Sequence, residues 1–206
     1  MKITQNLIPA SKYDTKCPYP MTPEFIVIHN TANDASAANE IAYMLRNDNS
    51  VSYHYAIDDK EIIQAIPENR NAWHAGDGNK GRGNRYGIAI EICYSKSGGE
   101  RFIKAEQLAA KFIAAKLKEK GWGIDRVTKH QDYANKYCPH RTLDMGWERF
   151  IDMIKKELTV MDNMTLDEAL TILKDKLGID TAYWQRAAGV VNHLPDFIIK
   201  VAKELK

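Results

Sequence analysis

Phe25-Ile26-Val27-Ile28-His29-Asn30-Thr31 is a continuous apolar run that ends in three polar side chains. Such a run predicts a strand that is buried on both faces, as in the middle of a sheet covered by helices. His29 then stands where this central strand leaves the core. The stretch therefore predicts both a central strand over residues 25–29 and a functional group at its end.

Strand-like and helix-like segments interleave through the rest of the first 158 residues. Apolar or alternating runs predict further strands at residues 51–58, 61–66, 86–94 and 127–129. Apolar residues at helical spacing predict helices at residues 35–47, with Asp34 as N-cap, and at 105–120 and 147–158. This order predicts an α/β fold with a central mixed β-sheet flanked by helices.

Two further segments lack such patterns. Residues 1–24 contain four prolines, which favours an extended arm over regular helix. Residues 69–85 are polar and rich in glycine, so we expect a long loop, and loops of this length are usually functional.

The C-terminal part reads as a small all-α module at residues 163–206, joined through a linker at 159–164. Thr165-Leu166-Asp167-Glu168 has the hydroxyl and the carboxylate of a capping box. Three apolar stripes follow and predict three short helices. Such a short segment has a marginal core by itself, so its stripes must pack on one another, on residues 1–158, or on a second copy in a homo-oligomer.

Composition restricts the function classes. The 206 residues are 44% hydrophobic, which predicts a buried core, and the formal net charge of +2 is too small to predict binding to nucleic acid or an anionic membrane. No apolar run is long enough for a transmembrane helix, and the first residues lack the apolar part of a secretory signal. With three cysteines in all, we expect Cys17 and Cys93 to be free thiols in a reducing cytoplasm.

A candidate metal site comes from Lys129-His130-Gln131-Asp132-Tyr133-Ala134-Asn135-Lys136-Tyr137-Cys138-Pro139. His130 and Cys138 can reach one zinc ion if this segment loops back, and His29 would be a third ligand. Three protein ligands leave the fourth position open, as in catalytic zinc sites. Each residue alone is more often a hydrogen-bonded histidine or a small buried thiol, but their combination favours a zinc site.

A hydrolytic zinc site also needs a base and a cation. Glu91 is the candidate base, because it shares one face of the strand at 86–94 with small residues and so has open space above it. An ion pair with a helix lysine is an equally weighted alternative. Lys136, two positions before Cys138, is the candidate cation; an ordinary solvated lysine is the alternative.

Five short motifs occur in one order along the chain. They are His29-Asn30-Thr31-Ala32, Ser52-Tyr53-His54-Tyr55, Ala72-Trp73-His74-Ala75-Gly76, Gly87-Ile88-Ala89-Ile90-Glu91, and His130 to Pro139 with Asp132, Lys136 and Cys138 between. Together they resemble the type 2 N-acetylmuramoyl-L-alanine amidases, which include phage endolysins and bacterial autolysins and are related to the peptidoglycan recognition proteins. The resemblance covers about residues 1–158.

The resemblance implies a zinc enzyme that hydrolyses the amide between the lactyl group of N-acetylmuramic acid and L-alanine in peptidoglycan. It implies metal ligands (His29, His130, Cys138), catalytic residues (Glu91, Lys136, Tyr53) and substrate-binding residues (His74, Asn30, Trp73). Glu91 would take a proton from water, and Lys136 and zinc would stabilise the oxyanion. Asp132 is expected to orient a ligand imidazole, and His54 and His140 are expected to be structural.

Alternatives to this enzyme remain. A muropeptide-binding protein of the same fold is one, but its non-catalytic members typically lack the zinc cysteine, so Cys138 favours an enzyme. A structural zinc site would need a fourth ligand from His54, His74 or Cys17.

The setting of the activity is a separate expectation. The lack of a signal sequence predicts an endolysin held in the cytoplasm until a phage holin opens the membrane, or an autolysin exported by another route. Residues 163–206 are expected to target the cell wall or to self-associate, with bracing of the first domain as the alternative.

Overall fold

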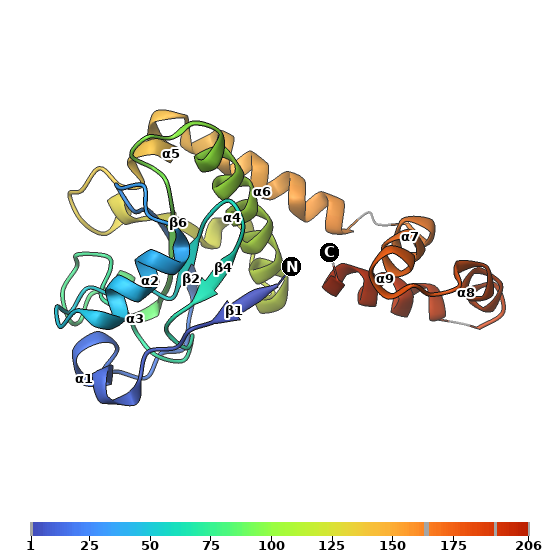
Figure 1. Cartoon of the computed structure of the whole chain (residues 1–206), viewed down its shortest axis with the longest axis horizontal. Helices are drawn as coiled ribbons and strands as arrows, with labels where there is room; N and C mark the ends of the chain where they lie inside the picture. The colour runs from blue at the N-terminus through green and yellow to red at the C-terminus, as the bar shows by residue number, and fades with distance from the viewer. Residues whose placement is uncertain (1, 163–164, 192, 206) are drawn as a thin grey trace. The chain divides into compact units, whose positions relative to one another are not determined.

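The computed structural model describes residues 2–162, 165–191 and 193–205. Two compact units divide the chain, one over Lys2–Lys155 and one over Lys156–Lys206. The first unit holds a β-sheet with helices packed around it, and the second is helical (Figure 1).

Six strands of the described residues form one sheet in the order β1-β4-β3-β5-β2-β6. Their bounds are Ile3–Gln5 (β1), Phe25–Asn30 (β2), Tyr55–Ile57 (β3), Ile62–Gln64 (β4), Gly87–Ile92 (β5) and Val127–Lys129 (β6). β3 and β4 pair antiparallel, whereas the other neighbouring strands pair parallel. The predicted mixed α/β sheet is therefore confirmed.

β2 and β5 are neighbouring interior strands of the sheet and determine where the polar side chains emerge. Every residue of β2 is buried, as the apolar run predicts for a strand covered on both faces. The parallel register places His29 beside Glu91, and β6 beside β2 ends immediately before His130. Parallel strands share their carboxyl ends, so these side chains gather at one edge of the sheet.

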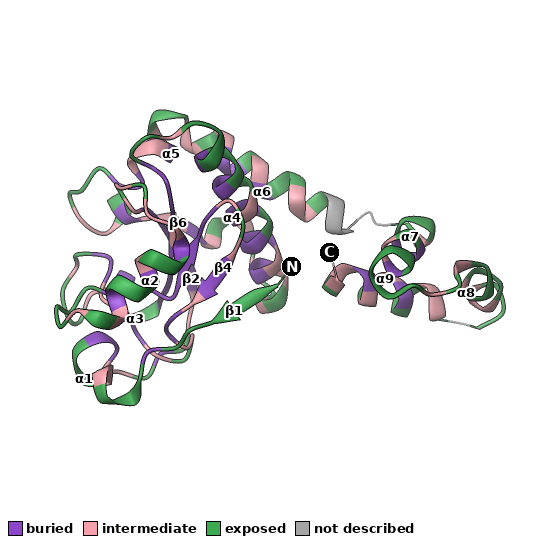
Figure 2. Ribbon diagram, in the orientation of Figure 1, coloured by how far each residue is buried: buried purple, intermediate pink, exposed green. Residues whose placement is uncertain are grey.

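Helices cover the sheet with their apolar faces, as the burial colours in Figure 2 show. In α2 (Ala37–Arg46) the buried residues are Ala37, Ile41 and Met44, at helical spacing. α4 (Gly99–Lys120) packs against β3 and β5. The remaining helical segments of this unit are η1 (Ala10–Lys12), α1 (Tyr13–Lys16), α3 (Arg82–Tyr86), η2 (Ile124–Arg126), η3 (His130–Asp132), α5 (His140–Asp144) and the start of α6 (Trp147–Asp162).

Several predicted boundaries are wrong. α4 begins at Gly99 rather than at residue 105, since Phe102 continues its buried face. Ser36 caps α2, because its Oγ accepts from the N–H of Asn39, whereas Asp34 accepts from Ser97. α3 interrupts the expected loop at 69–85 near its end, and α6 extends to Asp162, inside the expected linker. The rest of that linker, 163–164, lies outside the described residues.

The N-terminal segment is more regular than an extended arm. β1 adds a strand to the sheet edge, and residues 10–16 form the helical turns η1 and α1, so the extended prediction is wrong there. Lys16 is fully buried, and its Nζ donates to Asn47 Oδ1 at 2.7 Å, Asn49 Oδ1 at 3.2 Å and the Val51 carbonyl at 3.1 Å. The segment therefore holds the chain that follows α2.

A polar cluster ties α4 to the sheet. Glu68, whose side chain is 14% exposed, receives hydrogen bonds or ion pairs from Tyr55 Oη at 2.7 Å, Lys116 Nζ at 2.9 Å and Lys120 Nζ at 2.8 Å. Burial by itself raises the pKa of Glu68, but these three donors outweigh it and lower the pKa to about 2. The carboxylate is thus held in its charged form.

The second unit contains three helices beyond α6 in its described residues, as predicted: α7 (Leu166–Leu177), α8 (Thr181–Ala188) and α9 (Leu194–Leu205). Thr165 and Glu168 form the predicted capping box, and Gly178 ends α7 with a φ of +66°. Residues from α7 and α9 make the buried core, which consists of Ala169, Leu170, Leu173, Ile198 and Ala202. Residues 192 and 206, which belong to the predicted all-α module, lie outside the described residues.

Cys17, Cys93 and Cys138 are all buried free thiols. Within the described ranges, no helix combines the length and the apolar character that crossing a bilayer requires.

Candidate active site and metal centre

Three metal-donor side chains meet at the carboxyl ends of β2 and β6. His29 Nδ1 lies 3.0 Å from His130 Nδ1 and 3.9 Å from Cys138 Sγ, and the donor atoms of all three residues lie within 4.8 Å of one another. His29 is the last residue but one of β2, His130 begins η3, and Cys138 lies in the loop between η3 and α5. All three side chains are buried.

Two of the donor separations, both from His29 Nδ1, fit a tetrahedral metal ion. Two nitrogen donors about 2.0–2.1 Å from a zinc ion lie about 3.3 Å apart, and a nitrogen and a sulfur about 3.6 Å apart. The observed 3.0 Å and 3.9 Å are within a few tenths of an ångström of these values. Among the described residues the group has no fourth histidine, cysteine or carboxylate donor, so a four-coordinate ion held by these three residues would have one position open to another ligand.

The electrostatics of the three groups also suit a metal. Burial lowers the pKa of His29 well below its usual value, with help from His74, His130 and Lys136, and lowers the pKa of His130 to about 4. Both imidazoles are therefore neutral near pH 7 and offer lone pairs. Burial, and next the charge of Glu91, raise the pKa of Cys138 to about 11. A bound cation would favour the thiolate over the thiol.

His74 touches the opposite nitrogen of His29. Its Nδ1 lies 3.0 Å from His29 Nε2, and the two rings meet edge to face with centroids 5.0 Å apart. Burial is the main cause that lowers the pKa of His74; His54 and His130 lower it further, whereas main-chain groups of Gly87 and Gly83 oppose the shift. The structure thus places His74 behind a metal-donor ring, and its predicted substrate contact stays a prediction.

Glu91 stands beside the metal-donor group. Its neighbour across the β2–β5 pair is His29. Its Oε2 is buried and has no hydrogen-bond partner among the described residues, and the described ion pairs do not include the alternative pairing with a helix lysine. Burial, and next the charge of Glu40, raise the pKa of Glu91 to about 8, although Lys136 opposes this. Such a carboxyl group can exchange a proton near neutral pH.

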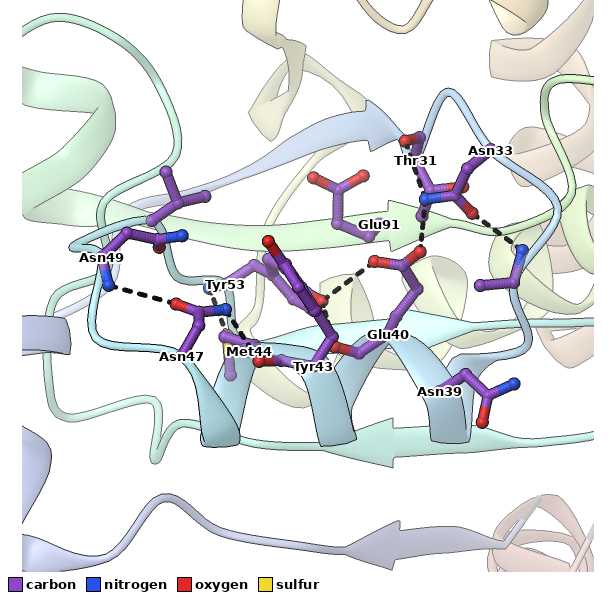
Figure 3. A pocket seen from close by; sticks show the side chains of 12 residues that line it. Thr31, Asn33, Asn39, Glu40, Tyr43, Met44, Asn47, Asn49, Tyr53 and Glu91 are labelled. Carbon is purple, nitrogen blue, oxygen red and sulfur yellow. Dashed lines mark hydrogen bonds between the residues drawn. The ribbon is translucent and has the colours of Figure 1, made fainter.

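Glu91 also forms part of the wall of an open cavity of about 570 Å³ between β5, the β2–α2 loop and α2 (Figure 3). Side-chain amides dominate the rest of the wall, together with tyrosines and a second carboxylate. The hydroxyl of Thr31 is buried there and, like Glu91 Oε2, lacks a partner among the described residues. The lining residues are Thr31, Asn33, Ala35, Asn39, Glu40, Tyr43, Met44, Asn47, Asn49, Val51, Tyr53 and Glu91.

Tyr53 lies in this wall and hydrogen-bonds to α2. Its hydroxyl donates to the Glu40 carbonyl at 3.0 Å and lies 3.4 Å from Glu40 Oε2. Burial, and next the charge of Glu91, raise the pKa of Tyr53, so the phenol stays protonated. Sequence reasoning missed Glu40, since it is one of several polar residues on the exposed side of α2 and only the fold brings it to Glu91.

Lys136 is exposed and lies between two tight turns that lead to Cys138. Its N–H donates to the Ala134 carbonyl at 2.7 Å, and its own carbonyl accepts from the N–H of Cys138 at 2.8 Å. The charge of Lys136 contributes to the pKa shifts of His29, His130 and Glu91, which places the ammonium group near the site.

Asp132 does not have the predicted contact with an imidazole. Its carboxylate accepts from the main-chain N–H of Lys129 at 3.0 Å and pairs with Lys129 Nζ. The side chain therefore caps η3, because its first turn leaves main-chain donors unsatisfied. Asp132 supports His130 only through the main chain.

The side chains of the predicted substrate-binding residues Asn30 and Trp73 form hydrogen bonds with other parts of the chain. The Asn30 side chain accepts from the N–H of Thr142 at 3.1 Å and donates to the Thr142 hydroxyl at 3.3 Å, which joins β2 to α5. Trp73 Nε1 donates to the Thr15 carbonyl at 3.1 Å. The cavity wall includes neither residue, so their contact with substrate stays a prediction.

His54 and His140 have structural hydrogen bonds. His54 Nδ1 accepts from the N–H of Ala89 at 3.0 Å, which leaves its Nε2 to donate to the Arg70 carbonyl at 2.9 Å. His140 Nε2 lies 3.2 Å from the Ser95 carbonyl. These contacts agree with the expectation that both residues support the fold.

This chain is similar to known proteins. The family described as N-acetylmuramoyl-L-alanine amidase matches residues 19–141. The N-acetylmuramoyl-L-alanine amidase CwlA of Bacillus subtilis is 57% identical over 177 residues, which are 85% of this chain and 65% of that protein. The amidase XlyB of the same organism is 59% identical over 157 residues, 76% of this chain and 50% of that protein.

A solved structure agrees with these matches. The structure of PlyL matches this chain with a TM-score of 0.73 and 52% sequence identity. The matched region covers 75% of this chain and 97% of the PlyL chain. The present chain spans only about half to two thirds of the length of the two curated relatives.

Proposed function

This chain belongs to the N-acetylmuramoyl-L-alanine amidase family, and from that premise we propose that it is a zinc-dependent peptidoglycan hydrolase. The bond cut would be the amide between the lactyl group of N-acetylmuramic acid and L-alanine. The observation that carries the proposal is the group of His29, His130 and Cys138 beside Glu91, which itself lines an open cavity.

Zinc is the metal that suits these donors. Two neutral imidazoles and one thiolate in a tetrahedral arrangement favour zinc over the oxygen-seeking calcium and magnesium. When bound, zinc would supply Lewis-acid chemistry toward the amide carbonyl and water.

The chain's own residues would move the protons and balance the charge. Glu91 would accept a proton from the attacking water and transfer it to the departing amine of L-alanine as the C–N bond breaks. Its raised pKa of about 8 suits both directions of transfer. Lys136 would stabilise the negative charge that develops on the carbonyl oxygen. Tyr53 would stay protonated and keep donating its hydrogen bond to the main-chain carbonyl of Glu40.

The cavity wall suits a muropeptide. Amide side chains such as Asn33, Asn39 and Asn49 can pair with the peptide and N-acetyl groups of such a substrate. The unpartnered Thr31 hydroxyl and Glu91 Oε2 would gain partners when substrate or water enters. Peptidoglycan is therefore the proposed partner.

The second candidate is a muropeptide-binding protein of the same fold that does not cut. Cys138 and Glu91 favour the enzyme, because binding alone needs neither a thiolate nor a carboxyl group with a raised pKa. We further propose that the protein acts as an endolysin or autolysin that reaches the wall after synthesis in the cytoplasm. Residues 163–206 would keep it on the wall or associate with a second copy.

The test begins with metal removal. Chelation should abolish the release of L-alanine amino termini from purified peptidoglycan, and zinc should restore it, with the new termini identified by mass spectrometry. Cys138→Ser should lose most bound zinc, since a hydroxyl is a poor substitute for thiolate. Full zinc content and activity in Cys138→Ser would refute the ligand assignment, and muropeptide binding without new termini would favour the second candidate.

A further inference from the structure

We infer that His74 is a positioning residue for the metal ligand His29: its Nδ1 accepts the N–H of His29 Nε2 and so aims the lone pair of His29 Nδ1 at the metal. This inference rests on the proposed zinc site. It assigns His74 a role different from the substrate contact that the sequence suggests.

The geometry around His29 supports this direction of the hydrogen bond. A neutral imidazole carries one proton on two nitrogens. If Nδ1 binds a metal, the proton must be on Nε2, and the atom facing Nε2 at 3.0 Å is His74 Nδ1. His29 is 2% exposed and His74 8% exposed, so water is largely kept from this contact. His74 Nδ1 must then be the acceptor.

A histidine in this place differs from the usual support of a zinc-bound imidazole. That support is commonly a carboxylate, a main-chain carbonyl or water. A neutral acceptor orients the ring without adding a negative charge next to the thiolate of Cys138 and the carboxyl group of Glu91. It also binds the proton of His29 less strongly than a carboxylate would, which leaves more Lewis acidity at the metal.

The loop that carries His74 is held tightly. Asn84 Oδ1 accepts from the main-chain N–H groups of both His74 and Ala75, each at 2.8 Å. A Cβ at Gly83 would lie 2.5 Å from the Ala75 side chain, so this contact has no room for a larger residue. The loop therefore fixes the position of the His74 ring rather than letting it follow His29.

The other nitrogen of His74 carries a cost in this tautomer. With Nδ1 as the acceptor, its proton is on Nε2, which is buried with no partner at full hydrogen-bond geometry among the described residues, although main-chain groups of Gly87 and Gly83 favour a protonated ring. A buried N–H without a partner has a free-energy cost. The reverse tautomer would avoid it, but would place a proton on His29 Nδ1, toward His130 and the metal. Zinc binding and the tautomer of His74 are thereby coupled.

Two variants separate the effect of the hydrogen-bond acceptor at position 74 from the effect of the side-chain volume. In His74→Asn the side-chain oxygen is attached to Cγ, as Nδ1 is in histidine, so it can still accept from His29 Nε2. In His74→Leu the volume is kept and the acceptor is lost. We expect the zinc dissociation constant, measured in the full chain by competition with a chromophoric chelator, to rise roughly 10–100-fold in His74→Leu and only a few-fold in His74→Asn. Thermal unfolding of the metal-free variants checks that both are folded.

A measurement on the unchanged protein keeps the test decisive if a variant fails to fold. Nitrogen-15 spectra of labelled histidines in the zinc-loaded wild-type chain should show His74 protonated at Nε2 and unprotonated at Nδ1. A His74 ring protonated at Nδ1, or a folded His74→Leu with wild-type zinc affinity, would overturn this inference alone. A wild-type chain that binds no zinc would instead overturn the proposed function, and this inference with it.

Discussion

Replacing Glu68 with glutamine should destabilise the first unit in a manner that depends on pH. The substitution keeps the shape of the side chain but removes the charge that Lys116, Lys120 and Tyr55 hold. It leaves two buried or partly buried ammonium groups without the negative charge that balances them. An unbalanced buried charge is the main free-energy cost of breaking such a cluster.

The magnitude follows from the pKa of Glu68. The carboxyl group has an ordinary value of 4.5 and is lowered to about 2 in the folded protein. Each unit of pKa difference corresponds to about 1.4 kcal/mol, so the charged form contributes roughly 3 kcal/mol to the free energy of unfolding at pH 7. Because the folded pKa lies below the unfolded one, this contribution is complete above about pH 4.5 and disappears as the pH falls toward 2. At pH 3 about half of it should remain.

The assay is urea unfolding of wild-type chain and Glu68→Gln at pH 7 and pH 3, followed by tryptophan fluorescence. Glu119→Gln is a matched control, because Glu119 pairs with the same Lys116 and Lys120 but its side chain is 52% exposed. That variant should lose less than about 1 kcal/mol. Equal losses for the two variants at pH 7, or a Glu68→Gln loss that does not shrink at pH 3, would refute the reasoning.

The remaining predictions concern the site and the second unit. Glu91→Gln should keep its zinc and its fold and lose roughly 10²–10⁴-fold in turnover on peptidoglycan, the usual effect of removing a general base; near-normal turnover would make Glu91 a structural residue. Lys136→Ala should likewise keep zinc and lose turnover, and a variant with unchanged kcat would remove Lys136 from the mechanism. A chain ending after Leu158 should still cleave soluble muropeptides but bind and lyse whole cells poorly; lower thermal stability with unchanged wall binding per folded molecule would instead indicate a brace.

The order of the elements could be predicted because it depends on local patterns. The apolar run at 25–28 specifies a strand wherever it lies, and the Thr165–Glu168 capping box specifies a helix start from two side chains. The predicted ends of helices were wrong where a tertiary contact determines them. Ser36 rather than Asp34 caps α2, because Ser97 from a distant loop occupies the Asp34 carboxylate.

The site was predictable only in part for the same reason. Residue types and strand ends pointed to His29, His130 and Cys138, and the structure brings these donors together. The neighbours of the site come from elements whose approach no local pattern records. Glu40 reaches Tyr53 from the polar side of a helix, and His74 reaches His29 from a loop 45 residues further along the chain.

The donors of the candidate metal centre are widely separated along the chain. His130 lies 101 residues and Cys138 109 residues after His29. A zinc ion at this place would act as a removable cross-link that closes a loop spanning most of the first unit, and it would bind the folded chain in preference to the unfolded one. The supply of metal would then determine the proteolytic lifetime of the protein as well as its turnover. Chain without zinc would unfold more often, so proteases would cleave it faster.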